Sequence, residues 1–241
     1  MNLVIDFGNT RIKVAIFRGT EQTQLFVYEN QEKFLAEIKT ISAGISSCII
    51  SSVSTNIDEL GQFLSSIVCL PFTSTTPIPI KNLYESGSTL GSDRLAAAVG
   101  ANAIFKNQNV LNIDTGTCIK FNFINKQNEF VGGSIAPGLQ MRLNALHHFT
   151  ARLPQLEAPV SFDKLIGKNT EESLLSGTLT NAILETDAVI NAYRQEVGEL
   201  KIILSGGNTD FFAGRLKNSI FARPNLVLEG LNSILIHNVT R

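Results

Sequence analysis

The chain has 241 residues, of which 44% are hydrophobic and 17% are charged, and its formal net charge is −1. This composition is typical of a globular protein with a sizeable core, and it excludes a disordered chain. Because there is no basic excess and no apolar run near the ~18 residues of a membrane span, we expect neither nucleic acid nor a membrane as a partner. The three cysteines are widely spaced, and the first residues lack the basic and cleavage regions of a signal peptide. We therefore expect reduced thiols and a cytoplasmic location.

The first elements of the chain form a predicted β-hairpin. Leu3–Asp6 is expected to be one strand, and Arg11–Phe17, in which apolar residues alternate along the sequence, is expected to be the second. The connection contains Gly8 and Asn9, which tolerate turn geometry. Asp6, Gly8, Asn9 and Thr10 thus lie at the tip of the hairpin, either as a tight turn or as a phosphate-binding loop.

The rest of the first half alternates between helical and extended patterns. Helices are predicted over Glu32–Ile41, Asn56–Leu64 and Asp93–Phe105, where apolar or alanine residues recur at helical spacing. Ser47–Val53 has the pattern of a short buried strand, and Pro71–Pro79 that of a loop. This alternation indicates an α/β unit.

The second half begins with an echo of the hairpin. Residues 110–124, VLNIDTGTCIKFNFI, again contain a strand pattern, an Asp-x-Gly loop followed by Thr, and a second strand pattern. Asp114 stands 108 residues after Asp6. This single long-period echo predicts two related lobes, which we assign to residues 1–109 and 110–241.

The remaining segments continue this lobe. Gly132–Gly138, GGSIAPG, is expected to be a glycine-rich loop. Helices are predicted over Leu139–Phe149 and Thr170–Gln195, and a closing helix over Leu231–His237. A buried strand is predicted from Lys201 to the double-glycine turn SGGN at 205–208.

The two Asp-x-Gly loops have the chemistry of a phosphate site. Glycine lets backbone N–H groups approach phosphate oxygens, a Thr hydroxyl can donate to them, and a strand-end Asp can hold Mg²⁺ through water. Each loop joins strand to strand, so neither is a Walker A motif. Either loop alone is more often a plain hairpin turn. Two in the same frame favour phosphate binding, and the later SGG turn could admit an adenine or a ribose.

The order DxGNTxxK, DxGT and SGG resembles the nucleotide-binding signature of the superfamily of acetate and sugar kinases, heat-shock chaperones and actin. Nearly the whole chain also resembles the type III pantothenate kinases. The segments that carry this resemblance are DFGNTRIK (6–13), Tyr84, GSDRLAAAVGA (91–101), NIDTGT (112–117), GGSIAPGLQMRLNAL (132–146) and GKNT (167–170).

The resemblance implies an α/β fold of two actin-like, ribonuclease H-like lobes, each a mixed sheet flanked by helices, with the active site in the cleft. It implies a homodimer and an ATP-dependent kinase that phosphorylates the 4'-hydroxyl of pantothenate. That reaction gives 4'-phosphopantothenate and is the first step of coenzyme A biosynthesis. The implied ions are Mg²⁺ and a monovalent cation, K⁺ or NH₄⁺.

The resemblance also implies site residues, the first of which is Asp93 as the catalytic base. The implied ATP-binding residues are Asp6, Phe7, Gly8, Asn9, Thr10, Arg11, Ile12, Lys13 and Thr117. The implied pantothenate-binding residues are Tyr84, Gly91, Ser92, Asp93, Arg94 and Thr170. Asp114 falls on the position that coordinates the monovalent cation, and Asp6 on the carboxylate that holds Mg²⁺ through water.

Ordinary interpretations of these residues stay open. Asp93 could be only a helix cap, Arg94 a surface side chain and Thr170 a helix N-cap. Conversely, a carboxylate that accepts a hydroxyl proton and aims the oxygen is what a kinase acting on an alcohol needs. Two other functions also stay open. One is a kinase or phosphatase of the same superfamily with another substrate, and the other is a nucleotide-binding regulator without turnover.

Overall fold

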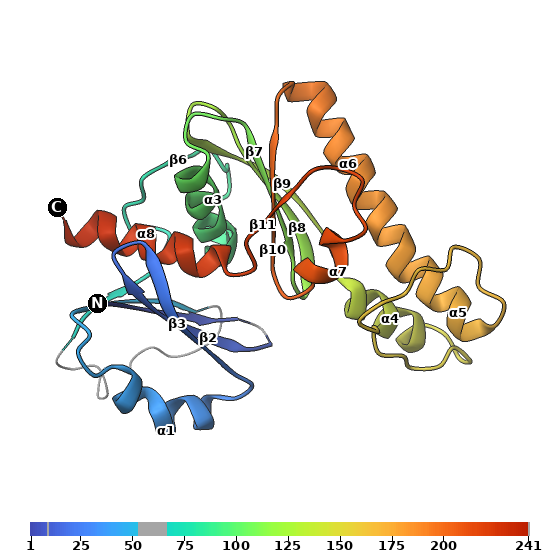
Figure 1. Ribbon diagram of the computed structural model, residues 1–241, viewed down its shortest axis with the longest axis horizontal. Coiled ribbons are helices and arrows are strands. Elements are labelled where there is room, and N and C mark those ends of the chain that lie inside the picture. Colours follow the sequence, from blue (N-terminus) through green and yellow to red (C-terminus); the bar gives the residue numbers. More distant parts are fainter. Residues whose placement is uncertain (9, 53–66, 241) are drawn as a thin grey trace. The chain divides into compact units, whose positions relative to one another are not determined.

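The computed structural model describes residues 1–8, 10–52 and 67–240, and Figure 1 shows its elements in chain order. Asn9 and the predicted helix over 56–64 lie outside the described residues. The chain divides into two compact units. The first unit contains residues 1–107, 124–132 and 225–241, and the second contains 108–123 and 133–224. The predicted lobes have a single boundary at 109/110. In the structure, residues 124–132 and 225–241 lie beyond that boundary but belong to the first unit.

A five-stranded sheet forms the centre of the first unit, in the order β3-β2-β1-β4-β5. β1 pairs antiparallel with β2 and parallel with β4, so the sheet is mixed. The predicted hairpin is confirmed, whereas β3 was not predicted because most of its side chains are exposed and it lacks a regular apolar pattern. The strands are β1 (Asn2–Phe7), β2 (Ile12–Arg18), β3 (Glu21–Tyr28), β4 (Ser47–Ser52) and β5 (Val68–Pro71).

Three described helices complete the first unit: α1 (Gln31–Ile41), α3 (Ser92–Ile104) and α8 (Leu226–Val239). α1 begins where the side chain of Asn30 accepts a hydrogen bond from the backbone N–H of Lys33, and it buries Phe34 and Ile38 in the core. All three confirm predicted helices, although α8 starts before the predicted Leu231. A short 3₁₀ turn, η1 (Gly87–Thr89), precedes α3.

Helices α3 and α8 pack against each other through glycines. A Cβ atom added to Gly230 would lie 1.8 Å from the carbonyl oxygen of Ala96, and one added to Gly100 would lie 2.7 Å from that of Leu226. The buried Asn232 of α8 also donates to the carbonyl of Gly19 and accepts from the side chain of Asn2. The C-terminal helix is therefore an integral part of the first unit.

The second sheet has six strands in the order β11-β10-β7-β8-β9-β6. β10 pairs in parallel with both β7 and β11, and β6 pairs in parallel with residues of β9 that belong to the first unit. The strands are β6 (Lys81–Asn82), β7 (Val110–Thr115), β8 (Cys118–Ile124), β9 (Glu129–Pro137), β10 (Lys201–Ser205) and β11 (Phe221–Ala222).

The glycine-rich segment Gly132–Gly138 was predicted to be a loop, and this prediction is wrong. Residues 132–137 continue strand β9. Gly132 and Gly133 have φ values of +139° and +148°, and a Cβ atom on Gly133 would lie 1.7 Å from the carbonyl oxygen of Phe121. These glycines therefore allow a close approach of two backbones, and they do not form a turn.

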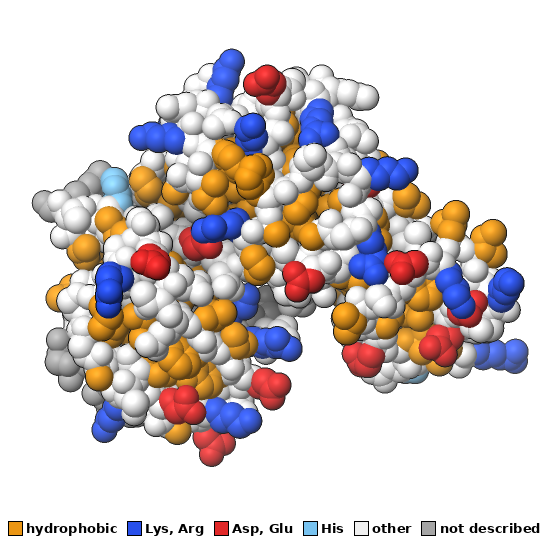
Figure 2. All heavy atoms as spheres, viewed as in Figure 1, with side chains coloured by type: hydrophobic (Ala, Val, Ile, Leu, Met, Phe, Trp, Pro, Cys, Tyr) orange, Lys and Arg blue, Asp and Glu red, His pale blue; other side chains and the backbone are white. Residues whose placement is uncertain are grey.

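The helices of the second unit are α4 (Leu139–His148), α5 (Thr170–Leu175), α6 (Asn181–Val197) and α7 (Thr209–Ala213). The predicted helix over 170–195 is confirmed, with a π-helical stretch, η2 (Ser176–Thr180), joining α5 to α6. The core of this unit includes Leu111 and Phe121 from the sheet and Leu143, Leu179 and Ile190 from the helices. Within the described residues, no helix is long and apolar enough to cross a membrane. On the face shown in Figure 2, positive and negative side chains are interspersed.

Candidate functional site

The first Asp-x-Gly segment begins at the end of β1. In the sheet, Asp6 is in register with Lys13 of β2 on one side and with Ser51 of the parallel strand β4 on the other. The backbone N–H of Gly8 donates to the carbonyl of Arg11 at 3.1 Å, and a Cβ atom on Gly8 would lie 3.1 Å from the same oxygen. The side chains of Phe7 and Ile12 are buried in the core. These two residues can therefore contact a nucleotide only through their backbones, whereas Thr10 and Arg11 are exposed.

A hydrogen bond between two serines links β4 to the start of α3. The hydroxyl oxygens of Ser51 and Ser92 are 3.0 Å apart, and Ser51 is buried. Because Ser51 is in register with Asp6 and Ser92 precedes Asp93, this bond connects the end of the first strand with the predicted catalytic helix. Ser51 was not predicted as a site residue, because a serine near a strand end carries no pattern of its own.

Asp93 lies in the first turn of α3, and the N-cap of this helix is Gly91. The Oδ1 atom of Asp93 accepts a hydrogen bond from the backbone N–H of Arg94 at 2.8 Å. A Cβ atom on Gly91 would lie 2.6 Å from that oxygen, so the glycine leaves room for the carboxylate. The positive end of the helix dipole also stabilises negative charge at this position. The interpretation of Asp93 as the N-cap is therefore wrong.

Arg94 is a buried residue whose guanidinium lies against two aromatic rings. Its guanidinium carbon lies 5.3 Å from the centre of the Tyr84 ring and 5.8 Å from that of the Phe130 ring. The two rings stack on each other at 6.1 Å, and Gly132 lies close to the Tyr84 ring. Arg94 is 5% exposed, so the alternative of a surface side chain is excluded. Two of the predicted pantothenate-binding residues, Tyr84 and Arg94, are thus in contact.

Phe130 is the residue of this cluster that the sequence analysis missed. It is fully buried on β9, and in the sequence it follows Glu129 without any motif. Only the pairing of β9 with the short strand β6, which Asn82 ends, places the ring against Tyr84. The sequence holds no local signal for this contact, because residues 84 and 130 are far apart along the chain.

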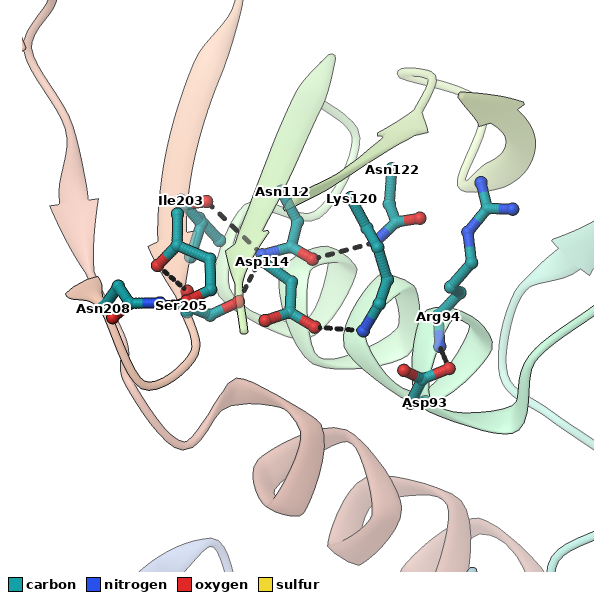
Figure 3. A network of polar contacts seen from close by, with 10 residues as sticks. Asp93, Arg94, Asn112, Asp114, Lys120, Asn122, Ile203, Ser205 and Asn208 are labelled. Carbon is teal, nitrogen blue, oxygen red and sulfur yellow. Dashed lines mark hydrogen bonds and ion pairs between the residues drawn. The ribbon is translucent and has the colours of Figure 1, made fainter. Parts of the chain in front are cut away.

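The second unit places Asp114 at the end of β7, close to two glycine turns. Its Oδ2 atom forms an ion pair with Nζ of Lys120 at 2.7 Å (Figure 3). A Cβ atom would lie 2.3 Å from its Oδ1 atom if added to Gly206, and 3.2 Å if added to Gly116. One carboxylate oxygen therefore faces glycine backbone, while the other faces an ammonium group.

Buried amides and hydroxyls hold β7, β8 and β10 together beside Asp114, as Figure 3 shows. The side-chain amide of Asn112 donates to the hydroxyl of Ser205 at 2.9 Å and accepts from Asn122 at 3.2 Å. The hydroxyl of Thr115 donates to the carbonyl of Ser205 at 2.8 Å, and the side chain of Asn208 donates to the carbonyl of Thr115 at 2.9 Å. Because these polar groups are hydrogen-bonded to one another away from water, the network fixes the DTGT and SGGN turns against each other.

Thr117 and Thr170 lie at other points of the second unit. The carbonyl of Thr117 accepts a hydrogen bond from Gly138, which approaches so closely that a Cβ atom there would lie 2.3 Å from the same oxygen. Thr170 is exposed at the start of α5, and the cap of that helix is Asn169, whose side chain accepts from the N–H of Glu172. The interpretation of Thr170 as the N-cap is therefore wrong. Thr170 and the Tyr84–Arg94 pair belong to different units.

The described residues contain no group of three or more His, Cys, Asp or Glu side chains able to hold a metal ion. Mg²⁺ in phosphate-transfer sites is bound through one or two carboxylates, water and substrate oxygens. Asp6 offers one carboxylate at a strand end, beside the hydroxyl-bearing Ser51. This donor set fits a divalent ion that is held mainly by water and phosphate.

Comparisons with known proteins identify the family of this chain. The family model described as type III pantothenate kinase matches residues 2–192. The type III pantothenate kinase of Flavobacterium johnsoniae is 40% identical over 239 residues, covering 96% of both chains. That of Christiangramia forsetii is 39% identical over 244 residues and covers all of both chains.

Solved structures support the fold. A Campylobacter jejuni protein described as a Baf family transcriptional activator has a TM-score of 0.65 at 19% identity, over 99% of this chain and 100% of its own. Component A of the Acidaminococcus fermentans (R)-2-hydroxyglutaryl-CoA dehydratase has a TM-score of 0.51 at 13% identity, over 98% and 96%. The two mixed sheets with flanking helices are therefore the actin-like α/β fold that the sequence predicted. From the match of the family model and the full-length relatives, this chain belongs to the type III pantothenate kinase family.

Proposed function

We propose that this protein transfers the γ-phosphoryl group of ATP to the 4'-hydroxyl of pantothenate and forms 4'-phosphopantothenate. The observation that carries the proposal, beside family membership, is the start of α3. Asp93 is held there in the first helical turn, and the next residue, Arg94, is fixed against Tyr84. A carboxylate and a guanidinium at adjacent positions suit a substrate that has a hydroxyl to activate and a carboxylate to bind.

Asp93 is proposed to accept the proton of the 4'-hydroxyl as the oxygen attacks phosphorus. In a loose phosphoryl-transfer transition state, positioning and charge neutralisation supply most of the catalysis. The hydrogen bond from the Arg94 N–H fixes the direction of the carboxylate before substrate binds. The Ser51–Ser92 bond fixes the start of the helix that carries it.

Arg94 and Tyr84 are proposed to bind the carboxylate end of pantothenate. Contact with two aromatic rings helps to hold the guanidinium in place, and a planar guanidinium binds a carboxylate with directed N–H groups. Gly91 and Ser92 shape the same helix start. Thr170, which lies in the second unit, is proposed as a further pantothenate contact on the family resemblance alone.

The two Asp-x-Gly turns are proposed to bind ATP. In the first unit the described residues 6–8 and 10–13 offer their backbones and the exposed Thr10, and in the second unit the turn offers Thr117. Asp6 would hold Mg²⁺ through water, and the ion, when bound, neutralises phosphate charge. The K⁺ or NH₄⁺ ion expected at Asp114 would have to share that carboxylate with Lys120.

We also propose that the protein acts as a homodimer in the cytoplasm. The homodimer is an expectation of the family resemblance, and light scattering after size-exclusion chromatography would test it. A mass of one chain across the working concentration range would contradict the dimer without affecting the kinase proposal.

The kinase proposal is tested by measuring ADP release from ATP and Mg²⁺ with and without pantothenate, and by identifying the product by mass spectrometry. We expect release that depends on pantothenate and a product heavier by one phosphoryl group. Release with another small alcohol and none with pantothenate would indicate a different substrate. ATP binding by calorimetry without release on any acceptor would indicate the regulator.

A further inference from the structure

We propose that the ammonium group of Lys120 is a built-in cation at Asp114, so that this chain binds nucleotide and turns over without a monovalent metal ion. This inference rests on the proposed function, because it assigns Asp114 to the phosphate-binding region. It replaces the mobile K⁺ or NH₄⁺ ion of the sequence-based expectation with a side chain of the same charge.

The geometry around Asp114 supports this assignment. Nζ of Lys120 lies 2.7 Å from Oδ2, and the two side chains are only 17% and 11% exposed. The Oδ1 atom faces the backbones of Gly116 and Gly206, and a Cβ atom added to Gly206 would lie only 2.3 Å from it. An ion at Asp114 would therefore have to compete with an ammonium group that is already in hydrogen-bonding contact. The carboxylate does not fit a mobile cation while Lys120 holds this position.

Lys120 lies in β8, a largely buried strand. Lys120 stands between Ile119 and Phe121, both of which are buried in the core of the second unit. Partial burial of a lysine in such a strand is costly unless its charge is paired. The β7–β8 hairpin brings the ammonium to Asp114 from the neighbouring strand (Figure 3), so the cation is supplied with the fold and needs no separate binding step.

The charges make a lysine a suitable replacement. A buried Asp beside a phosphate-binding turn would repel phosphate oxygens, and one positive charge at Oδ2 removes this repulsion. A bound K⁺, a bound NH₄⁺ and a lysine ammonium each supply that single charge. Only the lysine does so at every salt composition, which gives the proposal a direct test.

The first experiment measures ADP release by the unmodified protein in chlorides of K⁺, NH₄⁺, Na⁺ and tetramethylammonium at constant ionic strength. Tetramethylammonium is too large to enter a site for a bare ion. We expect kcat/KM for ATP to vary by no more than about twofold, the scale of general salt effects. Stimulation by K⁺ or NH₄⁺ of about tenfold or more over tetramethylammonium would overturn the proposal.

The second experiment uses Lys120→Met, which keeps the aliphatic length and removes the charge. We expect kcat/KM in tetramethylammonium to fall about tenfold or more, and K⁺ or NH₄⁺ to restore most of it by binding the vacated carboxylate. An equal loss in all four salts would make Lys120 a structural brace only and would overturn the proposal. Lys106→Met, at an exposed lysine in the first unit, is the matched control and should behave like the unmodified protein in every salt.

Calorimetry of ADP binding provides a readout that needs no turnover. The affinity of the unmodified protein should be the same in K⁺ and in tetramethylammonium, whereas that of Lys120→Met should be higher in K⁺. If pantothenate-dependent ADP release is absent in every salt, the kinase proposal fails, and the calorimetric comparison still decides the role of Lys120. If Lys120→Met does not fold, the salt series on the unmodified protein decides it.

Discussion

The guanidinium carbon of Arg94 lies 5.3 Å from the centre of the Tyr84 ring, and the two residues belong to different local structures. Arg94 lies in the first turn of α3, whereas Tyr84 lies in the loop that follows β6. The contact fixes a positive charge at the start of the helix that also carries Asp93. It therefore joins the residue proposed to bind the substrate to the residue proposed to activate it.

Replacing Arg94 with lysine should weaken pantothenate binding. A lysine keeps the charge but loses the planar guanidinium that lies over the rings of Tyr84 and Phe130, and such contacts are worth about 0.5–2 kcal/mol. We expect the Arg94→Lys variant to raise KM for pantothenate about tenfold, with a smaller change in KM for ATP. Steady-state kinetics with each substrate varied would measure this. Arg152→Lys, at an exposed arginine, should leave both values unchanged, and an unchanged KM for pantothenate in Arg94→Lys would remove Arg94 from the substrate site.

Asp93→Asn should reduce turnover and leave ATP binding intact. The amide oxygen can still accept the hydrogen bond from the Arg94 N–H, so the helix start is preserved, but the side chain can no longer take a proton. Loss of a general base reduces kcat by about 10²- to 10⁴-fold.

The measurements for this variant are kcat by ADP release and ATP affinity by calorimetry. Glu32→Gln is the control, because Glu32 is an exposed acid in the first turn of α1. The Glu32→Gln variant removes a carboxylate from the second residue of a helix, the position that Asp93 has in α3, and it should not change kcat. Normal turnover in Asp93→Asn would exclude Asp93 as the base.

Gly230→Ala should destabilise the first unit. The added Cβ atom would lie 1.8 Å from the carbonyl oxygen of Ala96, so α3 and α8 must separate. Overpacking of this kind costs about 1–3 kcal/mol. Urea denaturation followed by circular dichroism would measure the shift in midpoint.

Gly177→Ala is the matched control for that experiment. Gly177 lies in the π-helical stretch η2, and a Cβ atom there would meet nothing within 4 Å. Because alanine favours helix over glycine by about 1 kcal/mol, this control should be neutral or slightly stabilising. Equal midpoints for the two variants would argue against close packing of α3 and α8 in solution.

Tyr28 should make stability depend on pH in the alkaline range. Burial and the hydrogen bond to Glu37, at 2.8 Å, raise the pKa of Tyr28 from 10.0 to about 12. Between these values the unfolded chain loses the proton while the folded chain keeps it, so the unfolded state is favoured increasingly. The stabilisation is therefore complete below pH 10 and is lost as the pH rises to about 12.

The Tyr28→Phe variant isolates this effect, because it lacks the titrating hydroxyl. At about pH 9 the unmodified protein should have the higher free energy of unfolding in urea denaturation, by the contribution of one hydrogen bond to a charged group, about 1.5–3 kcal/mol. The difference between the two proteins should shrink as the pH is raised through the alkaline range. A difference that stays constant to about pH 12 would show that Tyr28 ionises at its ordinary pKa.

Strong local patterns in the sequence predicted most elements of the fold. The hairpin at residues 3–17 and the helices over 32–41, 93–105 and 139–149 are confirmed to within a few residues, because alternating or helical apolar spacing reflects one buried face. Strand β3 lacks such a face, so its pairing with β2 was not visible. The glycines of residues 132–138 indicated a turn, whereas they serve close contact between β9 and the backbone of Phe121.

The sequence by itself determined the family, the alternation of strands and helices, and the residues proposed to act on ATP and pantothenate, because these depend on residue type and short spacing. Only the tertiary structure decided which of them meet. It buried Arg94 against Tyr84 and Phe130, linked Ser51 to Ser92, returned α8 to the first unit, and placed Lys120 against Asp114. Strand register and the packing of distant segments create these contacts, and no local pattern encodes them.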